Sequence, residues 1–460
     1  MQMKRTSLSN NAIFMARTVN QGENIRSLQE AIHTSASTAA LLERDSRVFF
    51  HQTLSTPVFQ VISKAEGAYI YDGEGKKYLD LHGNGVHTVG YQHPLVLQAV
   101  QDQIDAGLSF SPRRFTNLPA VELAEKLAQI APEDLNRVLF CPGGSEAIEM
   151  AVMMAKLYAG KWKTLSYYGA FHGASFQSVS IGADPHFREG LGPVMPGAIH
   201  LEMPDYYRNP WGWSEQQQID DEYIRQLRMQ VENNPGIAAL ITEPIFYNST
   251  VPTRYYWQGV QDICRQHGIL LIFDEIYTAF GRTGRMFACE HFVTPDILVI
   301  GKGFGGSIVP YAGIIGRETL NVLEHKSIGH YTHEKNPFCS SIARAVIEAV
   351  ETEHLVENAR VLGQYFKEGL LSLQEAFDCI GQVSGLGLNL AIDLVEDRHS
   401  KKRAVERAHQ LMQFCMQQGI AFKLIQGNIL NLKPALIIGK DDIDFVLETL
   451  RIGLSMFEQR

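Results

Sequence analysis

The run Ile269-Leu270-Leu271-Ile272-Phe273, which ends in Asp274, is one of four short apolar runs in the middle of the chain. Each run is too short for a helix and stops at polar or glycine-containing residues, which is typical of strands buried on both faces of a parallel sheet. Before this run, apolar residues repeat at helical spacing as far as Gly268, a natural helix stop. The alternation predicts an α/β fold with a parallel sheet covered by helices. The four runs cover residues 138–140, 236–242, 269–273 and 297–300.

The composition narrows the class of protein. The 460 residues carry 41 Lys and Arg against 50 Asp and Glu, and 45 % of them are hydrophobic, which is ordinary for a globular protein. No basic run is longer than residues 401–403, so we expect neither nucleic acid nor an anionic membrane surface as a partner. The six cysteines form no close pair, and we find no apolar segment of the ~20 residues that span a bilayer. We therefore expect a cytoplasmic protein with reduced thiols.

The chain is predicted to fold into two tightly packed parts. Residues 76–340 should form a large domain, while residues 1–75 and 341–460 together form a smaller one. Long helical patterns are predicted over residues 341–360 and 403–419, and we see no linker-like tract.

Three features follow the predicted strands, where parallel sheets bind their ligands. Gly143-Gly144-Ser145 precedes a helical pattern and offers backbone N–H groups to a phosphate. Lys302 follows residues 297–301 and could form a Schiff base, and Asp274 places a carboxylate at a strand end. Separately, each has an ordinary reading as a turn, a solvated lysine or a structural acceptor. Together they are the phosphate cup, imine-forming amine and acid that pyridoxal phosphate requires.

With these residues and their surrounding motifs, the chain resembles the class III pyridoxal-phosphate aminotransferases over about residues 55–455. The motifs are Gly143 to Ala147, Tyr168 to Gly173, Glu243-Pro244, Asp274 to Ile276, Phe280 to Phe287 and Gly301 to Gly303. The resemblance implies the α/β transferase architecture called fold type I. It has a mostly parallel seven-stranded sheet in the large, cofactor-binding domain and a smaller α+β domain.

The same resemblance implies roles for individual residues. Lys302 would bind the cofactor as a Schiff base and act as the general base, and Asp274 would hold the pyridine nitrogen. Phe171 and Ile276 would lie on the two faces of the ring, and Thr332 would reach the phosphate of a neighbouring subunit, which implies a homodimer. The cofactor-binding residues implied are Gly144, Ser145, Phe171, His172, Glu243, Asp274, Ile276, Lys302 and Thr332.

Two departures from the family pattern concern the substrate. Ornithine and 4-aminobutyrate aminotransferases bind a carboxylate with an Arg near the C-terminus and neutralise this Arg with a Glu. Asn431 and Asn248 stand at the corresponding places here, with Lys433 as a nearby cation. An enzyme that alternates between an amine and 2-oxoglutarate needs such a switch, so its loss favours a reaction that has no acceptor.

The family also includes lyases, and residues 111–120 and 281–291 resemble the branch that acts on 1-hydroxy-2-aminoethylphosphonate. This implies loss of the β-hydroxyl and release of phosphonoacetaldehyde and ammonia. Arg113 and Arg114 are candidate phosphonate ligands, because guanidinium groups bind such oxygens in pairs; the alternative is a solvated arginine pair. His330 and His333 lack a third spaced ligand, so we predict no metal site.

Other functions remain open at this point. The main alternative is an ω-aminotransferase that takes an amine such as 2-aminoethylphosphonate, with pyruvate as acceptor. A decarboxylase, an aminomutase or a non-catalytic cofactor-binding protein would share much of the same site.

Overall fold

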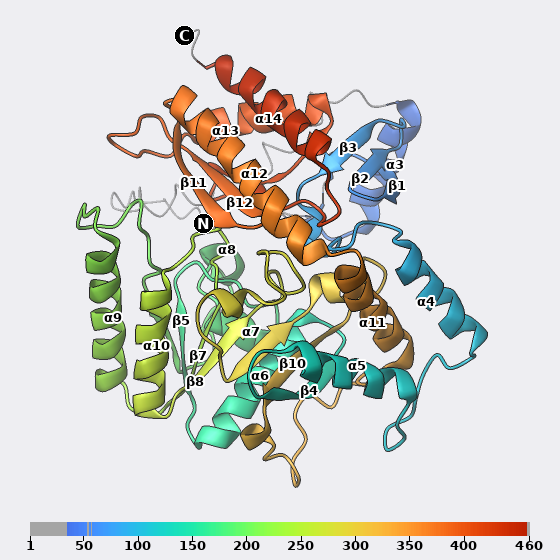
Figure 1. Cartoon of the computed structure of the whole chain (residues 1–460), viewed down its shortest axis with the longest axis vertical. Coiled ribbons are helices and arrows are strands. Elements are labelled where there is room, and N and C mark those ends of the chain that lie inside the picture. Colours follow the sequence, from blue (N-terminus) through green and yellow to red (C-terminus); the bar gives the residue numbers. More distant parts are fainter. Residues whose placement is uncertain (1–34, 53–54, 57, 458–460) are drawn as a thin grey trace, which may run out of the picture.

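A computed structural model describes residues 35–52, 55–56 and 58–457 of the chain. The seven strands of the central sheet lie in the order β4-β10-β9-β8-β7-β5-β6 (Figure 1). All neighbouring strands are parallel except β10, which is antiparallel to both β4 and β9. The predicted mostly parallel seven-stranded sheet is therefore confirmed. The strands are β4 (Leu135–Cys141), β5 (Lys163–Tyr167), β6 (Ala198–Leu201), β7 (Ile237–Thr242), β8 (Leu270–Asp274), β9 (Ile297–Ile300) and β10 (Ala312–Arg317).

Helices cover both faces of this sheet. Ile241 and Ile272 pack with the buried side of α6 (Gly144–Ala159) on one face. Phe273 points to the other face, where its ring lies 4.9 Å from that of Trp257 in α10 (Arg254–His267). Burial on both faces explains why the strands are continuously apolar. The other helices of this part are α4 (Pro94–Asp105), α5 (Leu118–Ile130), α7 (Phe176–Ile181), α8 (Pro185–Arg188), α9 (Gln216–Asn233) and α11 (Pro337–Thr352).

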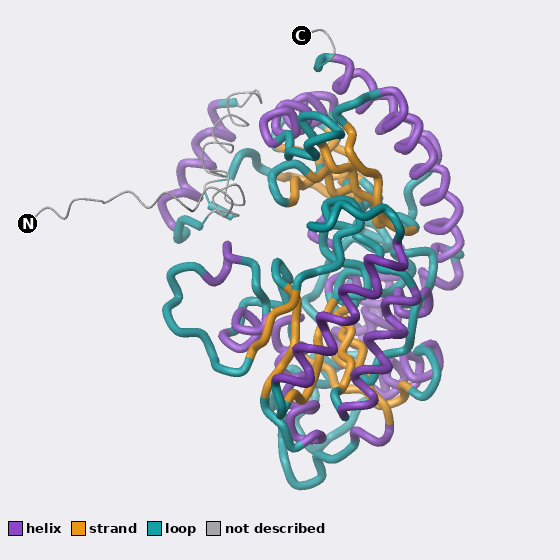
Figure 2. Tube along the Cα trace, turned by 90° about the vertical axis from the view of Figure 1, so that its left-hand side faces the viewer, coloured by secondary structure: helices purple, strands orange, loops and turns teal. Residues whose placement is uncertain are grey.

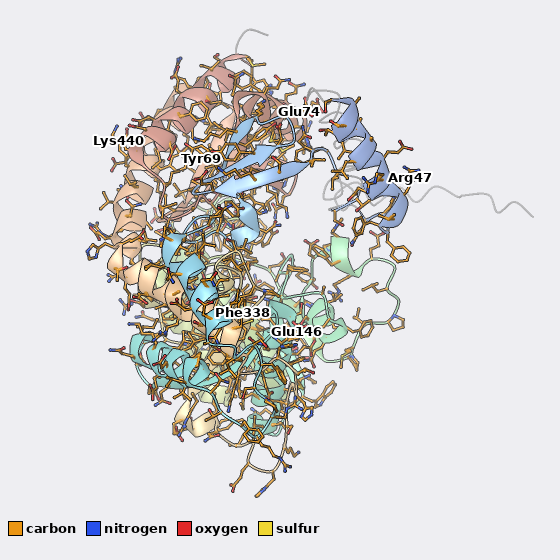
Figure 3. All side chains as sticks on the ribbon, turned by 90° about the vertical axis from the view of Figure 1, so that its right-hand side faces the viewer. Arg47, Tyr69, Glu74, Glu146, Phe338 and Lys440 are labelled. Carbon is orange, nitrogen blue, oxygen red and sulfur yellow. The ribbon has the colours of Figure 1, made fainter. Side chains whose placement is uncertain are left out.

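Two smaller sheets lie above the central sheet in the views of Figures 1 and 2. One joins β1 (Ile62–Glu66), β2 (Tyr69–Asp72) and β3 (Lys77–Asp80) to the late strand β13 (Ile420–Ala421). The other has the order β11-β12-β15-β14, formed by Ile380–Leu386, Asn389–Leu394, Ile429–Leu432 and Lys423–Ile425. Tyr69 of β2 donates a hydrogen bond to Asp442 of α14 (Lys440–Ser455), close to Lys440 in Figure 3. Early and late segments of the chain therefore share one layer.

The helices of the C-terminal third correct one prediction. The single helical pattern over residues 341–360 is wrong, because the chain turns between α11 and α12 (Leu355–Ala376). His354 has a φ of +52°, a left-handed conformation that apolar periodicity cannot reveal. The pattern over residues 403–419 corresponds to α13 (Val405–Gln418), which ends at Gly419 with a φ of +88°.

The N-terminal end of the described chain is α3 (Ala36–Val48). Residues 1–34, part of the segment predicted to join the smaller domain, lie outside the described residues. In the described ranges, no helix combines the length and the apolar character needed to cross a bilayer.

Candidate active site

Lys302 follows β9 and begins the short helix η3 (Lys302–Gly305). Its φ of +47° is a costly conformation for a lysine, and such strain is concentrated at functional sites. The side chain is accessible to solvent, and its Nζ lies 4.6 Å from the centre of the Tyr277 ring. The pKa of Lys302 is lowered, because desolvation by the surrounding protein outweighs the attraction of Asp274 and Glu243. A lysine of this kind more readily supplies a neutral, nucleophilic amine.

A turn that contains Gly85 packs closely against Lys302 and Tyr277. A Cβ atom at Gly85 would lie 2.7 Å from the Tyr277 ring and 3.1 Å from the Lys302 side chain. Gly85 also has a φ of +78°, which side chains rarely adopt. The close approach of this turn explains the glycine and holds Tyr277 beside the lysine.

Asp274 lies at the end of β8 and is held by two hydrogen bonds. Its Oδ2 is 2.8 Å from Nδ1 of His172, and its Oδ1 accepts the backbone N–H of Ile276 at 3.1 Å. Both Asp274 and His172 are buried. The other ring nitrogen of His172 is also buried and has no hydrogen-bond partner in the part of the chain that the structure describes. The carboxylate is therefore fixed in orientation at the strand end that the sequence predicted.

The N-terminus of α6 lies where the sequence predicted a phosphate cup. The backbone N–H groups of the first helical residues, Gly144, Ser145 and Glu146, have no acceptor within the helix, so they are available to an anion. A Cβ atom at Gly144 would come within 2.9 Å of the end of the Ile276 side chain, so the two residues pack closely. Ser145 accepts the N–H of Ala174 through its hydroxyl at 2.9 Å. Gly144, Ser145 and Ile276 thus lie together.

Glu243 adds a second carboxylate after β7. Its Oε2 accepts the backbone N–H of Tyr247 at 3.0 Å. Burial and the negative charge of Asp274 raise the pKa of Glu243, while Lys433 and Lys302 oppose this shift. The ends of three neighbouring parallel strands therefore bring together the charged residues that the sequence predicted there.

Phe171 is placed differently from the residues around Asp274. Its side chain is 42 % exposed, and its ring lies 4.4 Å from the ring of Phe187. It directly precedes His172, so the same segment carries both residues. The predicted role of Phe171 against a cofactor ring remains a prediction.

Arg113, Arg114 and Thr332 are all exposed and lie on two loops. Arg113 joins these loops: its Nε lies 3.2 Å from Oε1 of Glu334, and it donates to the carbonyl of Tyr331 at 3.1 Å. It also contacts the ring of His330. Within the described ranges, no hydrogen bond or ion pair joins the two arginines or Thr332 to Lys302 or Asp274.

Two further residues, Lys433 and Tyr277, lie near Lys302 in the structure. Lys433 is buried, its Nζ lies 4.4 Å from the centre of the Tyr277 ring, and its nearest acceptor is the carbonyl of Tyr247 at 3.3 Å. Tyr277 therefore lies beside both Lys302 and Lys433. The sequence marked Lys433 as a cation near Asn431, whereas nothing in it marked Tyr277 beyond its closeness to Asp274.

Asn248 and Asn431, which stand in place of the family's charged pair, share no hydrogen bond in the described part of the chain. The Oδ1 of Asn248 accepts the N–H of Thr250 at 3.1 Å. Asn431 lies in β15 and is buried. No group of three His, Cys, Asp or Glu side chains suited to a metal ion occurs among the described residues.

Comparison with known sequences and structures identifies relatives of the whole chain. The description of the matching family is "Aminotransferase class-III", and the match covers residues 50–453. The (R)-1-hydroxy-2-aminoethylphosphonate ammonia-lyase of Vibrio splendidus is 40 % identical over 438 residues, which are 92 % of this chain and 90 % of the relative. The leucine/methionine racemase of Thermococcus litoralis is 34 % identical, with 91 % and 96 % covered.

A solved structure has the same fold. The amine transaminase from an uncultivated Pseudomonas species, solved with pyridoxal phosphate bound, superimposes with a TM-score of 0.83 at 30 % sequence identity. The superposition covers 89 % of this chain and 98 % of the transaminase. The fold predicted from the sequence is therefore that of the relatives.

Proposed function

This chain belongs to the class III aminotransferase family, and on this premise we propose that it is an ammonia-lyase acting on 1-hydroxy-2-aminoethylphosphonate. The products would be phosphonoacetaldehyde and ammonia. The proposal rests on the similarity to the ammonia-lyase of Vibrio splendidus across 92 % of the chain. The replacement of the family's charged pair by Asn248 and Asn431 agrees with a reaction that needs no second amino acceptor.

Pyridoxal phosphate is the cofactor of this family, and the residues around Lys302 fit it. The N-terminus of α6 offers unpaired N–H groups to a phosphate, and Asp274 holds a fixed carboxylate for the ring nitrogen. Ile276 lies against Gly144 between these two points, where it would press on the ring. When bound, the cofactor supplies an aldehyde that combines with amines and a pyridinium ring that withdraws electrons from the adjacent carbon.

Lys302 would carry out the proton transfers. Its lowered pKa favours the neutral amine, which can take a proton from the substrate carbon that bears nitrogen. The resulting ammonium can donate this proton to the hydroxyl on the next carbon, which leaves as water. Uptake of one water then releases ammonia and the aldehyde, so the net reaction is substrate to phosphonoacetaldehyde plus ammonia. One residue thereby serves as base and acid.

A neighbouring subunit would complete the site. Arg113 ties the loop that carries Arg113 and Arg114 to the segment that carries Thr332. If Thr332 reaches the phosphate of the neighbouring subunit's cofactor, both loops approach that site together. The three residues would then bind anionic groups from outside the subunit that holds Lys302.

The decisive experiment is the release of ammonia and aldehyde from racemic 1-hydroxy-2-aminoethylphosphonate by the purified holoenzyme without any oxo acid. We expect many turnovers by the native protein and none by Lys302→Ala. Lys367→Met is the matched control, because Lys367 is a half-buried lysine of α12 that donates to the Gly385 carbonyl. No release by the native enzyme would refute the lyase.

An aminotransferase is the second candidate, because the amine transaminase superimposes over 89 % of the chain. It predicts no ammonia release without acceptor and turnover of 2-aminoethylphosphonate once pyruvate is added. The same assay therefore separates the two functions.

A further inference from the structure

Lys433 is a buried cation without a carboxylate partner. Its residue is 3 % exposed, and no ion pair within 4 Å involves it in the portion of the chain described. Its ammonium has three donors, but the carbonyl of Tyr247 is its single hydrogen-bond acceptor within the same portion. The face of the Tyr277 ring supplies a further, weaker contact. Burial lowers the pKa of Lys433 to about 7, and the nearby Glu243 carboxylate opposes this shift. Because a buried ammonium with so few partners is costly, an anion that binds here would stabilise the charged form of Lys433.

Asn431 lies in β15, and Lys433 is the first residue after the strand ends at Leu432. In an extended chain, side chains two positions apart point to the same side, so Asn431 is the neighbour in sequence that shares the side of Lys433. The Oδ1 of Asn431 is buried and has no hydrogen-bond partner among the residues described. Because the oxygen and nitrogen of an amide are interchangeable in placement, this group can equally present its N–H donors to a ligand. A second polar group at this place is thus also incompletely bonded.

Lys423 brings a second lysine to this face. It pairs with Asn431 across the β14–β15 ladder, so the two side chains project from the same side of the sheet. Its side chain is exposed, with no ion pair inside the described ranges. Burial is the main cause that lowers the pKa of Lys433, Lys302 and His82, and the positive charge of Lys423 lowers all three further, so Lys423 lies near the candidate active site.

From this arrangement we propose that Lys433, Asn431 and Lys423 form a subsite for the doubly charged acid group of the substrate. The subsite rests on the proposed function, since it names the residues that would hold the phosphonate. Lys302 and Lys433 both flank Tyr277, so an anion at Lys433 places the rest of a two-carbon substrate toward Lys302.

Two ammonium groups select for charge rather than for shape. A phosphonate dianion can bind both lysines at once, whereas a carboxylate carries one negative charge for the same two cations. The subsite therefore predicts a preference for phosphonates over carboxylates of similar length. It also predicts that the pair of lysines, and not the arginine pair on the outer loop, gives most of the affinity for the isolated anion.

The test is the binding of methylphosphonate and acetate to the holoenzyme, measured by isothermal titration calorimetry. In the holoenzyme the cofactor phosphate would already fill the phosphate cup, so the added anions cannot bind in that cup. We expect tighter binding of methylphosphonate than of acetate. Lys433→Met should weaken methylphosphonate binding about tenfold or more, and Lys423→Met by a smaller factor. Lys433→Arg should keep most of the affinity because it retains the charge.

Two control variants distinguish the lysine subsite from anion binding at the arginine loop. Lys367→Met should bind methylphosphonate like the native enzyme. Binding that is lost in the Arg113→Ala, Arg114→Ala double variant, but kept in Lys433→Met and Lys423→Met, would overturn the subsite. Equal binding of both anions would overturn it as well.

The outcome is independent of the lyase assay. If no ammonia is released but methylphosphonate binding depends on Lys433, the subsite stands and the lyase fails. If ammonia is released but methylphosphonate binding is unchanged in Lys433→Met and Lys423→Met, the lyase stands and the subsite fails.

Discussion

The pair formed by Asp274 and His172 illustrates how a single side chain acquires a chemical role. Asp274 is buried, and its carboxylate is oriented by Nδ1 of His172 and by the N–H of Ile276. It can therefore offer a fixed negative charge to a ring nitrogen. The neighbouring Glu275 is also buried, yet it points elsewhere and bonds only protein groups.

Asp274→Asn should keep the fold and lose most of the activity. An opposite charge changes the pKa of its partner by about 1–3 units, so loss of the carboxylate should slow turnover about ten- to a thousandfold. The measurement is the rate of ammonia release together with the absorbance spectrum of the bound cofactor at several pH values. Near-native turnover would refute the role of Asp274, and Glu275→Gln serves as the adjacent control, with turnover per folded molecule unchanged.

The segment after β8 joins the central sheet to the smaller sheets. Glu275 accepts the N–H groups of Ala288 at 2.6 Å and Cys289 at 2.8 Å, which fixes the short helix η2 (Ala288–His291) against the strand end. Within the same segment, the buried Arg282 donates to the carbonyls of Leu388 and Pro434. This segment therefore links the turn that carries Tyr277 to the sheet that carries Lys433.

Glu275 makes the stability of this segment depend on pH. Burial raises the pKa of Glu275 to about 7, although the hydrogen bonds from Cys289 and Ala288 oppose the shift. Between its ordinary value of 4.5 and about 7, the folded protein holds the proton more tightly than the unfolded chain. The contribution of Glu275 to the free energy of unfolding therefore falls as the pH rises through this window.

Chemical denaturation of the native protein and of Glu275→Gln tests this dependence. The free energy of unfolding of the native protein, relative to the variant, should decrease by about 2–3 kcal/mol from pH 4.5 to 7. A difference that does not change with pH, or that increases, would contradict the raised pKa. Glu290→Gln is a suitable control, because Glu290 lies in the same short helix but is exposed.

In the whole molecule, the charged residues of the candidate active site lie at the boundary between the central sheet and the two smaller sheets. Lys302 and Asp274 come from strand ends of the central sheet, whereas Lys423 and Lys433 come from β14 and the end of β15. Thr332 and the two arginines lie on the loops joined by Arg113, and no hydrogen bond or ion pair among the described residues joins them to this group.

Mixed dimers test the shared site. Thr332→Ala should hold the cofactor about tenfold more weakly, because one hydrogen bond to a charged phosphate is lost. Lys302→Ala should be inactive. If Thr332 acts across the interface, dissociating and reassembling the two variants together should restore about a quarter of the native activity, since half of the dimers then contain one intact site. Activity no higher than that of the separate variants would place Thr332 in the site of its own subunit.

Much of the fold and part of the site could be predicted from the chain. The buried strands were recognisable because burial on both faces requires continuous apolar runs, and residues directly after them necessarily gather at one sheet edge. This argument located Lys302, Asp274 and the glycine turn at residues 143–145. The break at His354 could not be predicted, because a left-handed residue leaves the apolar periodicity intact.

Only the tertiary structure decided the surroundings of Lys302. Sequence patterns describe neighbours along one helix or strand, but Lys433 is 131 positions from Lys302 and reaches Tyr277 through a different sheet. Among the described residues, the burial of Lys433 without an ion-pair partner and the unpaired Oδ1 of Asn431 are properties of the packed interior that no local pattern records. The ends of the strands, which the sequence predicts, determine where the candidate active site lies. The packing of the smaller sheets decides which charged side chains face this site, because the desolvation and pairing of a charge depend on contacts between distant segments.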